Sequence, residues 1–332
     1  MTLKNERDTI VKNVKEVKNM SRMSPLYENI KLNCTIVSDT HIDEKHPFPW
    51  LPKWRLKQVL RDAKKSNVPV DALMTVGDTT SRGSTANWEM VKECFEKVPQ
   101  CAEKIILPMG NHDGWNDDGY EAAMENYYKY YKTICGDELT KPYFSYIIKG
   151  YRFIYLGTDS SAGCEAQISD EQLEWFRDEI KADAESRKPV FVFCHQSLNQ
   201  KHGLPVTWDK DEDYENLSDG GIGEKSEQIE AILKTCPNVY YFSGHSHMGL
   251  AGEKTFKEKG FASFEQEGNL TLINLPSLAC GNHHGEIKSF CVGVQLEVYD
   301  DKVVIRPRSF KTRGWIKSVP LKNSKPYWED KI

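Results

Sequence analysis

Short apolar runs alternate along the chain with longer stretches in which apolar residues recur three and four positions apart. The runs are rich in Val, Ile, Phe and Tyr, which favour strands, whereas the longer stretches have the period of amphipathic helices. This alternation is typical of an α/β protein rather than of a helical bundle or a pure β-sandwich. We predict short strands at residues 34–37, 72–76, 104–108, 153–157, 190–194, 239–242, 270–275, 292–298 and 303–306.

The longer stretches predict helices, and one of them has a clear start signal. Ser169 can cap the amino end of this helix, while Gln172 can reach back as the other half of a capping box. Leu173, Phe176 and Ile180 then form its apolar face. The predicted helices cover residues 54–65, 87–97, 120–134, 170–186 and 225–235.

One large domain is the expected organisation of this chain of 332 residues. No repeat, low-complexity tract or linker rich in Pro, Gly or Ser divides it. Residues 1–30 are expected to form an N-terminal helical extension, because their apolar residues recur at helical spacing. A helix packed on the body is the preferred interpretation of that extension, and a partner-binding arm is the alternative. Residues 31–320 then form the domain, and residues 321–332 a C-terminal tail.

The charge balance is mildly acidic, with a formal net charge of -5 at pH 7 and a pI of about 6.0. The molecule as a whole therefore has no bias toward nucleic acid or an anionic membrane surface. No stretch approaches the roughly 20 apolar residues of a membrane-spanning helix, and the start of the chain does not resemble a secretory signal. Nine scattered cysteines without a Cys-x-x-Cys pair predict a reduced, cytoplasmic protein with neither a thiolate zinc site nor a dithiol redox site.

Residues 204–223 show neither helical nor strand period. They contain Trp208, a charged run at 209–213 and paired glycines at 220 and 221. We predict a long surface loop here, and a loop of this length in a compact domain is more often functional than decorative. A lid or substrate-contacting role and simple solvation of a charged turn are equally good interpretations.

The candidate chemistry lies where five of the predicted strands end, since each apolar run there gives way to Asp, His or Asn. Ligands of open α/β sheets gather at the carboxyl ends of the strands, so these residues can converge on one crevice. Carboxylate and amide oxygens with imidazole nitrogens, and no thiolate, suit divalent zinc, manganese or iron. The five clusters are Asp39-Thr40-His41, Gly77-Asp78, Gly110-Asn111-His112-Asp113, His195 and Gly244-His245-Ser246-His247.

The spacing within these clusters gives each pair of side chains a common direction. Alternation along an extended backbone places Asp39 and His41 on one side, and it does the same for His245 and His247. Glycines at positions 77, 110 and 244 permit tight turns or close approach. Asp-x-His and Gly-Asp alone are weak signals, and His195 could be a core histidine with its hydrogen bonds satisfied. Gly-Asn-His-Asp and Gly-His-Ser-His are more specific. The occurrence of all five clusters together, each after a predicted strand, favours one site.

This ordered set resembles the calcineurin-like metallophosphoesterase superfamily. The stretches at 143–160 and 292–315 are similar to the bacterial phosphodiesterase branch of that superfamily. The resemblance implies a four-layer αββα sandwich, in which two mixed β-sheets lie back to back, helices flank them and the site lies at one edge. It also implies that residues 31–320 form a single metallophosphoesterase domain.

The resemblance implies two bound divalent metal ions, Mn, Fe or Zn. Asp78 would bridge them, and a shared carboxylate also offsets the repulsion between two neighbouring cations. The remaining ligands would be Asp39, His41 and His247 for one metal, and Asn111, His195 and His245 for the other.

The implied reaction is in-line attack on a phosphate ester by a hydroxide that bridges the two metals. His112 would donate a hydrogen bond or proton to the leaving oxygen, and Asp113 would orient His112, with a plain loop acid as the alternative. Asn111, His112 and Arg82 are the candidate substrate contacts. For Arg82 a solvated loop arginine is the simpler interpretation.

A small phosphorylated substrate is expected, with a phosphodiester preferred over a monoester on similarity to the phosphodiesterase branch. The alternatives are a phosphomonoesterase, a nuclease and, less favoured, a catalytically silent binding scaffold. Ser81 stands where protein Ser/Thr phosphatases have Asp and purple acid phosphatases have a tyrosine ligand, so neither subfamily is expected. The acidic balance argues against nucleic acid. No membrane partner is predicted, and the sequence specifies no oligomeric state. Residues 281–284 resemble a metal loop but are interpreted as a plain surface loop or, less favoured, as a rim element.

Overall fold

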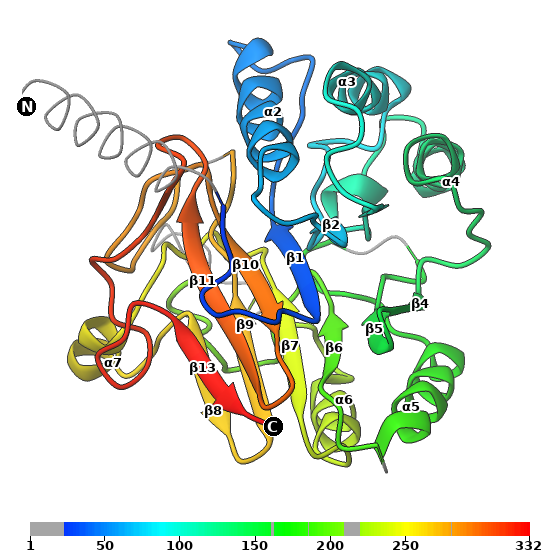
Figure 1. The fold of residues 1–332 in the computed structure, drawn as a ribbon. Helices are drawn as coiled ribbons and strands as arrows, with labels where there is room; N and C mark the ends of the chain where they lie inside the picture. Colours follow the sequence, from blue (N-terminus) through cyan, green and yellow to red (C-terminus); the bar gives the residue numbers. More distant parts are fainter. Residues whose placement is uncertain (1–22, 161–162, 185, 209–219, 280) are drawn as a thin grey trace, which may run out of the picture.

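The computed structural model describes residues 23–160, 163–184, 186–208, 220–279 and 281–332. Within these ranges, two mixed β-sheets face each other and helices flank them (Figure 1). The predicted α/β class and the sandwich of two mixed sheets flanked by helices are confirmed. The predicted N-terminal helix falls on residues 1–22, which lie outside the described residues.

The first sheet places the earliest strands of the chain beside the latest ones. Its strands are β1 (Leu32–Val37), β2 (Ala72–Thr75), β3 (Lys104–Ile106), β10 (Val292–Val298), β11 (Lys302–Ser309), β12 (Gly314–Trp315) and β13 (Trp328–Lys331). They lie in the order β12-β11-β10-β1-β2-β3, with β13 paired to β11. The β1-β2-β3 part is parallel, and all pairings from β1 through β10 to β13 are antiparallel.

The second sheet is built from the middle of the chain. Its strands are β4 (Phe144–Ile148), β5 (Tyr151–Tyr155), β6 (Val190–Phe193), β7 (Val239–Ser243), β8 (Phe264–Glu267) and β9 (Leu270–Asn274). The order is β4-β5-β6-β7-β9-β8, with parallel pairing from β5 to β9 and an antiparallel strand at each edge.

All five predicted helices are present, with ends that differ by a few residues from the prediction. A sixth described helix was not predicted, because seven residues are too few to show a period. The helices are α2 (Trp50–Lys64), α3 (Thr85–Lys97), α4 (Tyr120–Cys135), α5 (Asp170–Ala184), α6 (Ser226–Leu233) and α7 (Glu253–Lys259), with a 3-10 turn η1 (His112–Gly114).

Alternation along β5 shows how the layers are held together. The Tyr155 hydroxyl reaches the Met74 sulfur of β2 at 3.5 Å, so this face of β5 packs on the first sheet. The next side chain toward the amino end, Ile154, packs instead with Phe176 of α5 and Ile229 of α6. Successive residues of a strand point to opposite faces, so a strand buried on both sides has a continuous apolar sequence. Each such side chain contributes about 1.5–3 kcal/mol on burial.

The amino end of α5 is capped only partly as the sequence predicts. The Ser169 hydroxyl accepts a hydrogen bond from the Gln172 amide at 3.1 Å, which confirms one half of the capping box. The other half is wrong, because the Asp159 carboxylate accepts the Ser169 amide at 2.9 Å. Gln172 is fully buried, and its side chain binds both backbone groups of Gly157 instead. A buried amide must satisfy both its donor and its acceptor, and Gly157 offers both partners.

We predicted a C-terminal tail at residues 321–332, but these residues are part of the domain. They contain β13, which pairs with β11 and extends the first sheet. Trp328 of β13 also stacks on Phe264 of β8 in the second sheet, with 5.5 Å between ring centroids. A strand that is this short and this polar gives no strong signal in the sequence, and it forms because an edge of the sheet is available to pair with it.

Two expectations about the whole chain can be compared with the described ranges. Among the described helices, none combines the length and the apolar composition needed to cross a membrane. The eight cysteines within the described ranges are free thiols.

Candidate metal centre

The loops after β1, β2 and β3 of the first sheet meet the loops after β6 and β7 of the second sheet. Three overlapping groups of side chains result, and within each group the candidate ligand atoms all lie within 4.8 Å of one another. These groups are Asp39 with His41 and His247, His41 with Asp78 and His112, and Asp78 with His195 and His245. Six of the seven predicted metal ligands are therefore brought together.

Asp39 and Asp78 lie at the centres of this arrangement. Asp39 Oδ1 is 3.2 Å from His247 Nε2 and 3.7 Å from His41 Nε2. Asp78 Oδ2 is 3.0 Å from His195 Nε2 and 3.6 Å from His41 Nε2. Asp78 thus belongs to groups on both sides of the centre, which is the position that a bridging carboxylate requires.

The ligand loops have a backbone conformation that non-glycine residues rarely adopt. Positive φ angles occur at Asp39 (54°), His41 (43°), Asp78 (50°), His245 (64°) and His247 (47°). The prediction that these pairs alternate along an extended backbone is therefore wrong, because β1 and β7 end before the ligands begin. Such conformations cost about 1–3 kcal/mol each and persist at functional sites, where the surroundings determine them.

Close approach of the loops depends on glycine at two of the predicted positions. A β-carbon at Gly110 would overlap the Asp78 carboxylate, and one at Gly244 would overlap the Ser38 hydroxyl. Any larger residue would therefore push the ligand loops apart.

Asp113 holds two ligand loops together and does not orient His112 as expected. Its buried carboxylate accepts the amides of Thr79 and Thr80 at 3.2 and 2.8 Å, the Thr80 hydroxyl at 2.8 Å and the Gly110 amide at 2.9 Å. These bonds join the loop after β2 to the loop after β3. Burial and the neighbouring Asp78 raise the pKa of Asp113. Its hydrogen bonds give the side chain a supporting role between the two loops.

His112 is oriented by the backbone of the neighbouring loop. Its Nδ1 lies 3.0 Å from the Ser81 carbonyl, which can only accept, so Nδ1 carries the proton and Nε2 is the nitrogen left to act on a substrate. Its amide donates to Asp78 Oδ1 at 2.9 Å. The imidazole also packs against Trp115, with 4.0 Å between ring centroids. We did not select Trp115 from the sequence.

Neutral groups position the candidate ligands that follow the strands of the second sheet. His195 Nδ1 donates to the Val76 carbonyl at 2.6 Å, which fixes the ring so that Nε2 faces Asp78. Asn274 donates to the Gly244 carbonyl at 2.8 Å and accepts the Ser246 hydroxyl at 3.0 Å, so it holds the loop that carries His245. We did not select Asn274 from the sequence, because it lies within the predicted strand at 270–275 and not after it.

Asn111 and Arg82 have different surroundings. Asn111 is buried, and neither polar atom of its side chain has a hydrogen-bond partner among the described residues. A buried amide without partners is suited to bind a ligand. Arg82 pairs with Asp117 at 2.7 Å, and its side chain is 49% exposed. The structure therefore does not bring Arg82 into the cluster.

The electrostatics of the centre fit a cation. Burial alone would raise the pKa of Asp39, but His195 and His247 outweigh it and lower that pKa well below its ordinary value. Burial alone would lower the pKa of His195, but Asp78 and Asp39 raise it to about 9. Burial, and then His195, lower the pKa of His245. The two aspartates thus carry negative charge in a buried site, where an imidazolium now balances it and a divalent ion could do so.

Buried nitrogen and oxygen atoms without a described hydrogen-bond partner also support a cation site here. Within the described part of the chain, the buried His245 Nε2 and His247 Nδ1 have no hydrogen-bond partner, as is true of the Asn111 amide. Oxygen and imidazole nitrogen atoms of this kind suit zinc, manganese or iron. The residues that could hold metal are Asp39, His41, Asp78, Asn111, His195, His245 and His247.

The predicted loop at 204–223 is partly buried at its first described end, where Val206 is 63% exposed, and buried at its second. Leu204, Thr207 and Ile222 are buried, which corrects the prediction of a surface loop at these positions. Trp208 stacks on the His245 imidazole with 4.3 Å between ring centroids and 21° between planes. Residues 209–219 lie outside the described ranges.

Residues 281–284 support the site through their backbone. The His283 amide donates to the His247 carbonyl at 2.8 Å, and the Gly249 amide donates to the His283 carbonyl at 2.7 Å. The Asn282 side chain accepts the Ser277 amide at 2.8 Å and closes the preceding turn. This arrangement agrees with a rim element and not with a separate ligand set.

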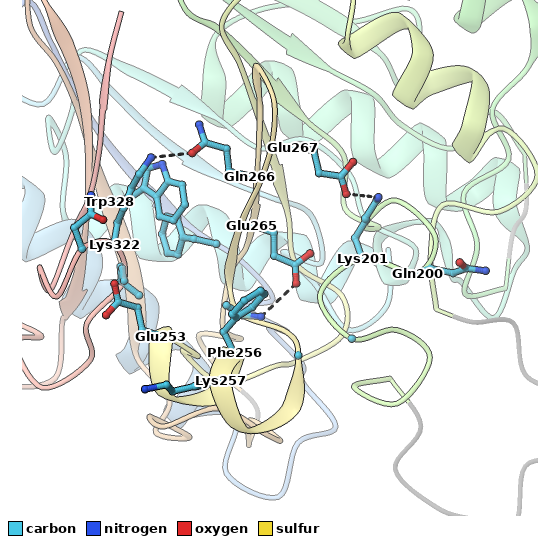
Figure 2. A pocket seen from close by; sticks show the side chains of 16 residues that line it. Gln200, Lys201, Glu253, Phe256, Lys257, Glu265, Gln266, Glu267, Lys322 and Trp328 are labelled. Atoms are coloured by element: carbon cyan, nitrogen blue, oxygen red, sulfur yellow. Dashed lines mark hydrogen bonds and ion pairs between the residues drawn. The ribbon is translucent and has the colours of Figure 1, made fainter.

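A cavity of about 730 Å³ lies on another part of the molecule, between α7, β8 and the turn at 321–323. None of the predicted site residues lines it. Figure 2 shows that two of its lysines have partners, Lys201 with Glu267 and Lys322 with Gln266. The chemistry of the protein is therefore assigned to the cluster of acids and histidines and not to this cavity.

Comparisons with known proteins agree with this geometry. A family model described as calcineurin-like phosphoesterase matches residues 32–249. A probable cyclic nucleotide phosphodiesterase of Rhodococcus erythropolis is 28% identical over 139 residues, and the match covers 39% of this chain and 40% of that protein. The chain thus spans less than half the length of this curated relative.

Two solved structures have a similar fold. A dimetal phosphatase from Danio rerio is 12% identical, with a TM-score of 0.55 over 85% of this chain and 97% of that chain. A purple acid phosphatase from yellow lupin seeds is also 12% identical, with a TM-score of 0.57 over 86% of this chain and 52% of that chain. At this level of identity the likeness concerns the fold alone.

Proposed function

Because the chain belongs to the calcineurin-like phosphoesterase family, we propose that it is a phosphodiesterase that uses two divalent metal ions. The observation that carries this proposal is the position of Asp78, which shares one ligand group with His41 and another with His195 and His245. A single buried carboxylate between two sets of imidazoles is what a pair of neighbouring cations requires.

The protein side chains have separate tasks in the proposed reaction. Divalent ions, when bound, would supply Lewis acidity toward water and the phosphoryl oxygens. Asp39, His41 and His247 would hold one ion, and Asn111, His195 and His245 the other, with Asp78 shared. His112 would face the leaving oxygen through Nε2, since Nδ1 donates to the Ser81 carbonyl.

A phosphodiester is the proposed substrate class, and two observations support it. The curated relative described above is itself a probable cyclic nucleotide phosphodiesterase. Trp115 lies against His112, so an aromatic surface adjoins the group that would face the leaving oxygen. An esterified leaving group with a planar substituent could pack there.

Initial rates on a bis-aryl phosphate and the matching mono-aryl phosphate, with manganese added, test the proposal. We expect at least about tenfold faster turnover of the diester and loss of both activities on treatment with a chelator. Faster turnover of the monoester would make the protein a phosphomonoesterase. Bound metal without turnover of either ester would favour the binding-scaffold alternative.

A further inference from the structure

The His245 ring is held differently from the other histidines of the centre. His195 and His112 each direct Nδ1 to a backbone carbonyl, which fixes their rings. Among the described residues no hydrogen bond holds the imidazole of His245, and its Nε2 is buried. Its ring contacts are instead with His195, edge to face at 5.0 Å, and with Trp208, stacked at 4.3 Å. The Trp208 indole thus covers one face of the His245 ring. Among the described histidines of the centre, His245 is the one whose ring has no hydrogen bond.

Trp208 is itself anchored by described residues. The Trp208 amide donates to the Pro205 carbonyl at 2.8 Å, and the preceding Thr207 hydroxyl donates to the His202 carbonyl at 3.0 Å. His202 is buried, and its Nδ1 lies 2.9 Å from the Ala262 carbonyl. This turn is therefore fixed to the body of the second sheet, and it carries the indole with it.

The backbone of Gly220 packs directly against the Trp208 indole. A β-carbon at this position would overlap the Trp208 ring, and Gly220 has a φ of 74°. The backbone thus approaches the ring as closely as it can. The indole is therefore confined by Gly220 and stacked on His245.

We propose that Trp208 is a positioning residue that holds the His245 imidazole in the orientation needed to bind metal. The inference rests on the proposed function, since it assigns His245 to one of two metal ions. Orienting groups of metal-binding histidines typically contribute about 10–100-fold to metal affinity. The contribution should be confined to the group of Asp78, His195 and His245, since among the described residues the ring contact of Trp208 is with His245.

Equilibrium dialysis against manganese, followed by elemental analysis, measures this role without any turnover. At a concentration that just saturates the wild-type chain with about two ions, Trp208→Ala should retain about one. Trp208→Phe keeps an aromatic ring over His245 and should restore the second ion. Trp115→Ala is the matched control, because it removes an indole from His112, which is not assigned to a metal.

A second pair of variants displaces the indole without removing it. Gly220→Ala should lower metal affinity as Trp208→Ala does, because the added methyl group forces the ring away from His245. Gly136→Ala is its control, since Gly136 also has a positive φ, of 87°, and has no neighbouring atom within 4 Å of the position of an added β-carbon. Both substitutions introduce the same kind of backbone strain. A difference in metal affinity between them therefore measures the effect of displacing the Trp208 ring.

The outcomes separate this inference from the proposed function. Wild-type affinity for both ions in Trp208→Ala would overturn the positioning role while leaving the proposed function intact. Equal loss of both ions, without recovery in Trp208→Phe, would show that the indole only stabilises the fold, and it would overturn the role as well. A wild-type chain that binds no metal would contradict the proposed function, and the positioning role with it.

Discussion

The two sheets support their shares of the metal centre with different chemistry. In the first sheet, one buried carboxylate, Asp113, accepts three backbone amides and a hydroxyl and so joins two ligand loops. In the second sheet, a neutral amide, Asn274, donates to a carbonyl and to two serine hydroxyls and accepts a third hydroxyl. We refer to these as the Asp113 network and the Asn274 network.

The choice of a carboxylate in one network and an amide in the other follows from the backbone groups that each loop turns toward it. The loops after β2 and β3 turn their N–H groups inward, and an ionised carboxylate can accept several of them because it has no donor. The loop after β7 presents the Gly244 carbonyl beside hydroxyl groups, and only an amide can both donate and accept there. The Asp113 network also places a carboxylate near Asp78, and its pKa is raised by burial and by that neighbour. The Asp113 network therefore has the stronger hydrogen bonds, but it must accommodate two neighbouring buried carboxylates.

Asp78→Asn gives the largest expected effect, because Asp78 is the side chain that both halves share. An amide removes the negative charge between the two groups of histidines, so we expect a loss in kcat/KM of about 10⁴-fold or more on the aryl diester. Metal content measured on the same sample should also fall. Activity within about tenfold of the wild type would mean that the two halves do not share a carboxylate.

His112→Ala tests a residue of the first-sheet half that is not assigned to a metal. We expect kcat to fall by about 10²–10⁴-fold, because a proton or hydrogen bond to the leaving oxygen is lost. Metal content by elemental analysis should be unchanged, since the substitution removes none of the seven proposed metal ligands. A normal rate with retained metal would remove His112 from the mechanism.

Asp113→Ala and Asn274→Ala compare the two networks directly. Asp113→Ala should lower the free energy of unfolding by about 3–4 kcal/mol, since it leaves three buried amides without their acceptor. Asn274→Ala should cost about 2 kcal/mol, because the hydroxyls that it leaves can rotate toward other partners. Urea unfolding measures both. Asp117→Ala is a matched control at an exposed aspartate and should cost less than about 1 kcal/mol. A larger cost for Asn274→Ala than for Asp113→Ala would reverse the comparison.

Arg82→Ala should have the smallest effect. The side chain is 49% exposed and pairs with Asp117, so we expect less than about a threefold change in kcat/KM. Steady-state rates on the diester at low and high salt provide the measurement. A drop of tenfold or more would show that Arg82 leaves Asp117 and contacts the phosphate after all.

The sequence predicted the parts of the site that are tied to local pattern. A buried strand followed by Asp, His or Asn is visible without a fold, so Asp39, Asp78 and His195 could be selected from it. The support of these residues could not be predicted, because it depends on which loops come together. Asp113 was assigned to its sequence neighbour His112, whereas its partners are Thr79, Thr80 and Gly110.

Four described strands, β4, β8, β12 and β13, were not predicted, and two of them show how pairing can decide the structure of a strand. β8 reads Phe-Glu-Gln-Glu and β13 reads Trp-Glu-Asp-Lys, and neither has enough apolar residues to show alternation. Each lies at an edge and pairs with one neighbour, so polar side chains are tolerated. The central strands could be located because both of their faces are buried and their sequences are continuously apolar.

The pairing of β1 with β10 has a consequence for how the protein is made. β1 is the first described strand, yet one of its two partners, β10, is synthesised after the whole of the second sheet. An emerging chain therefore leaves the backbone N–H and C=O groups on one edge of β1 unpaired until residue 298 has left the ribosome, and such strand edges are prone to misassociation. We expect the nascent protein to depend on chaperones during that interval.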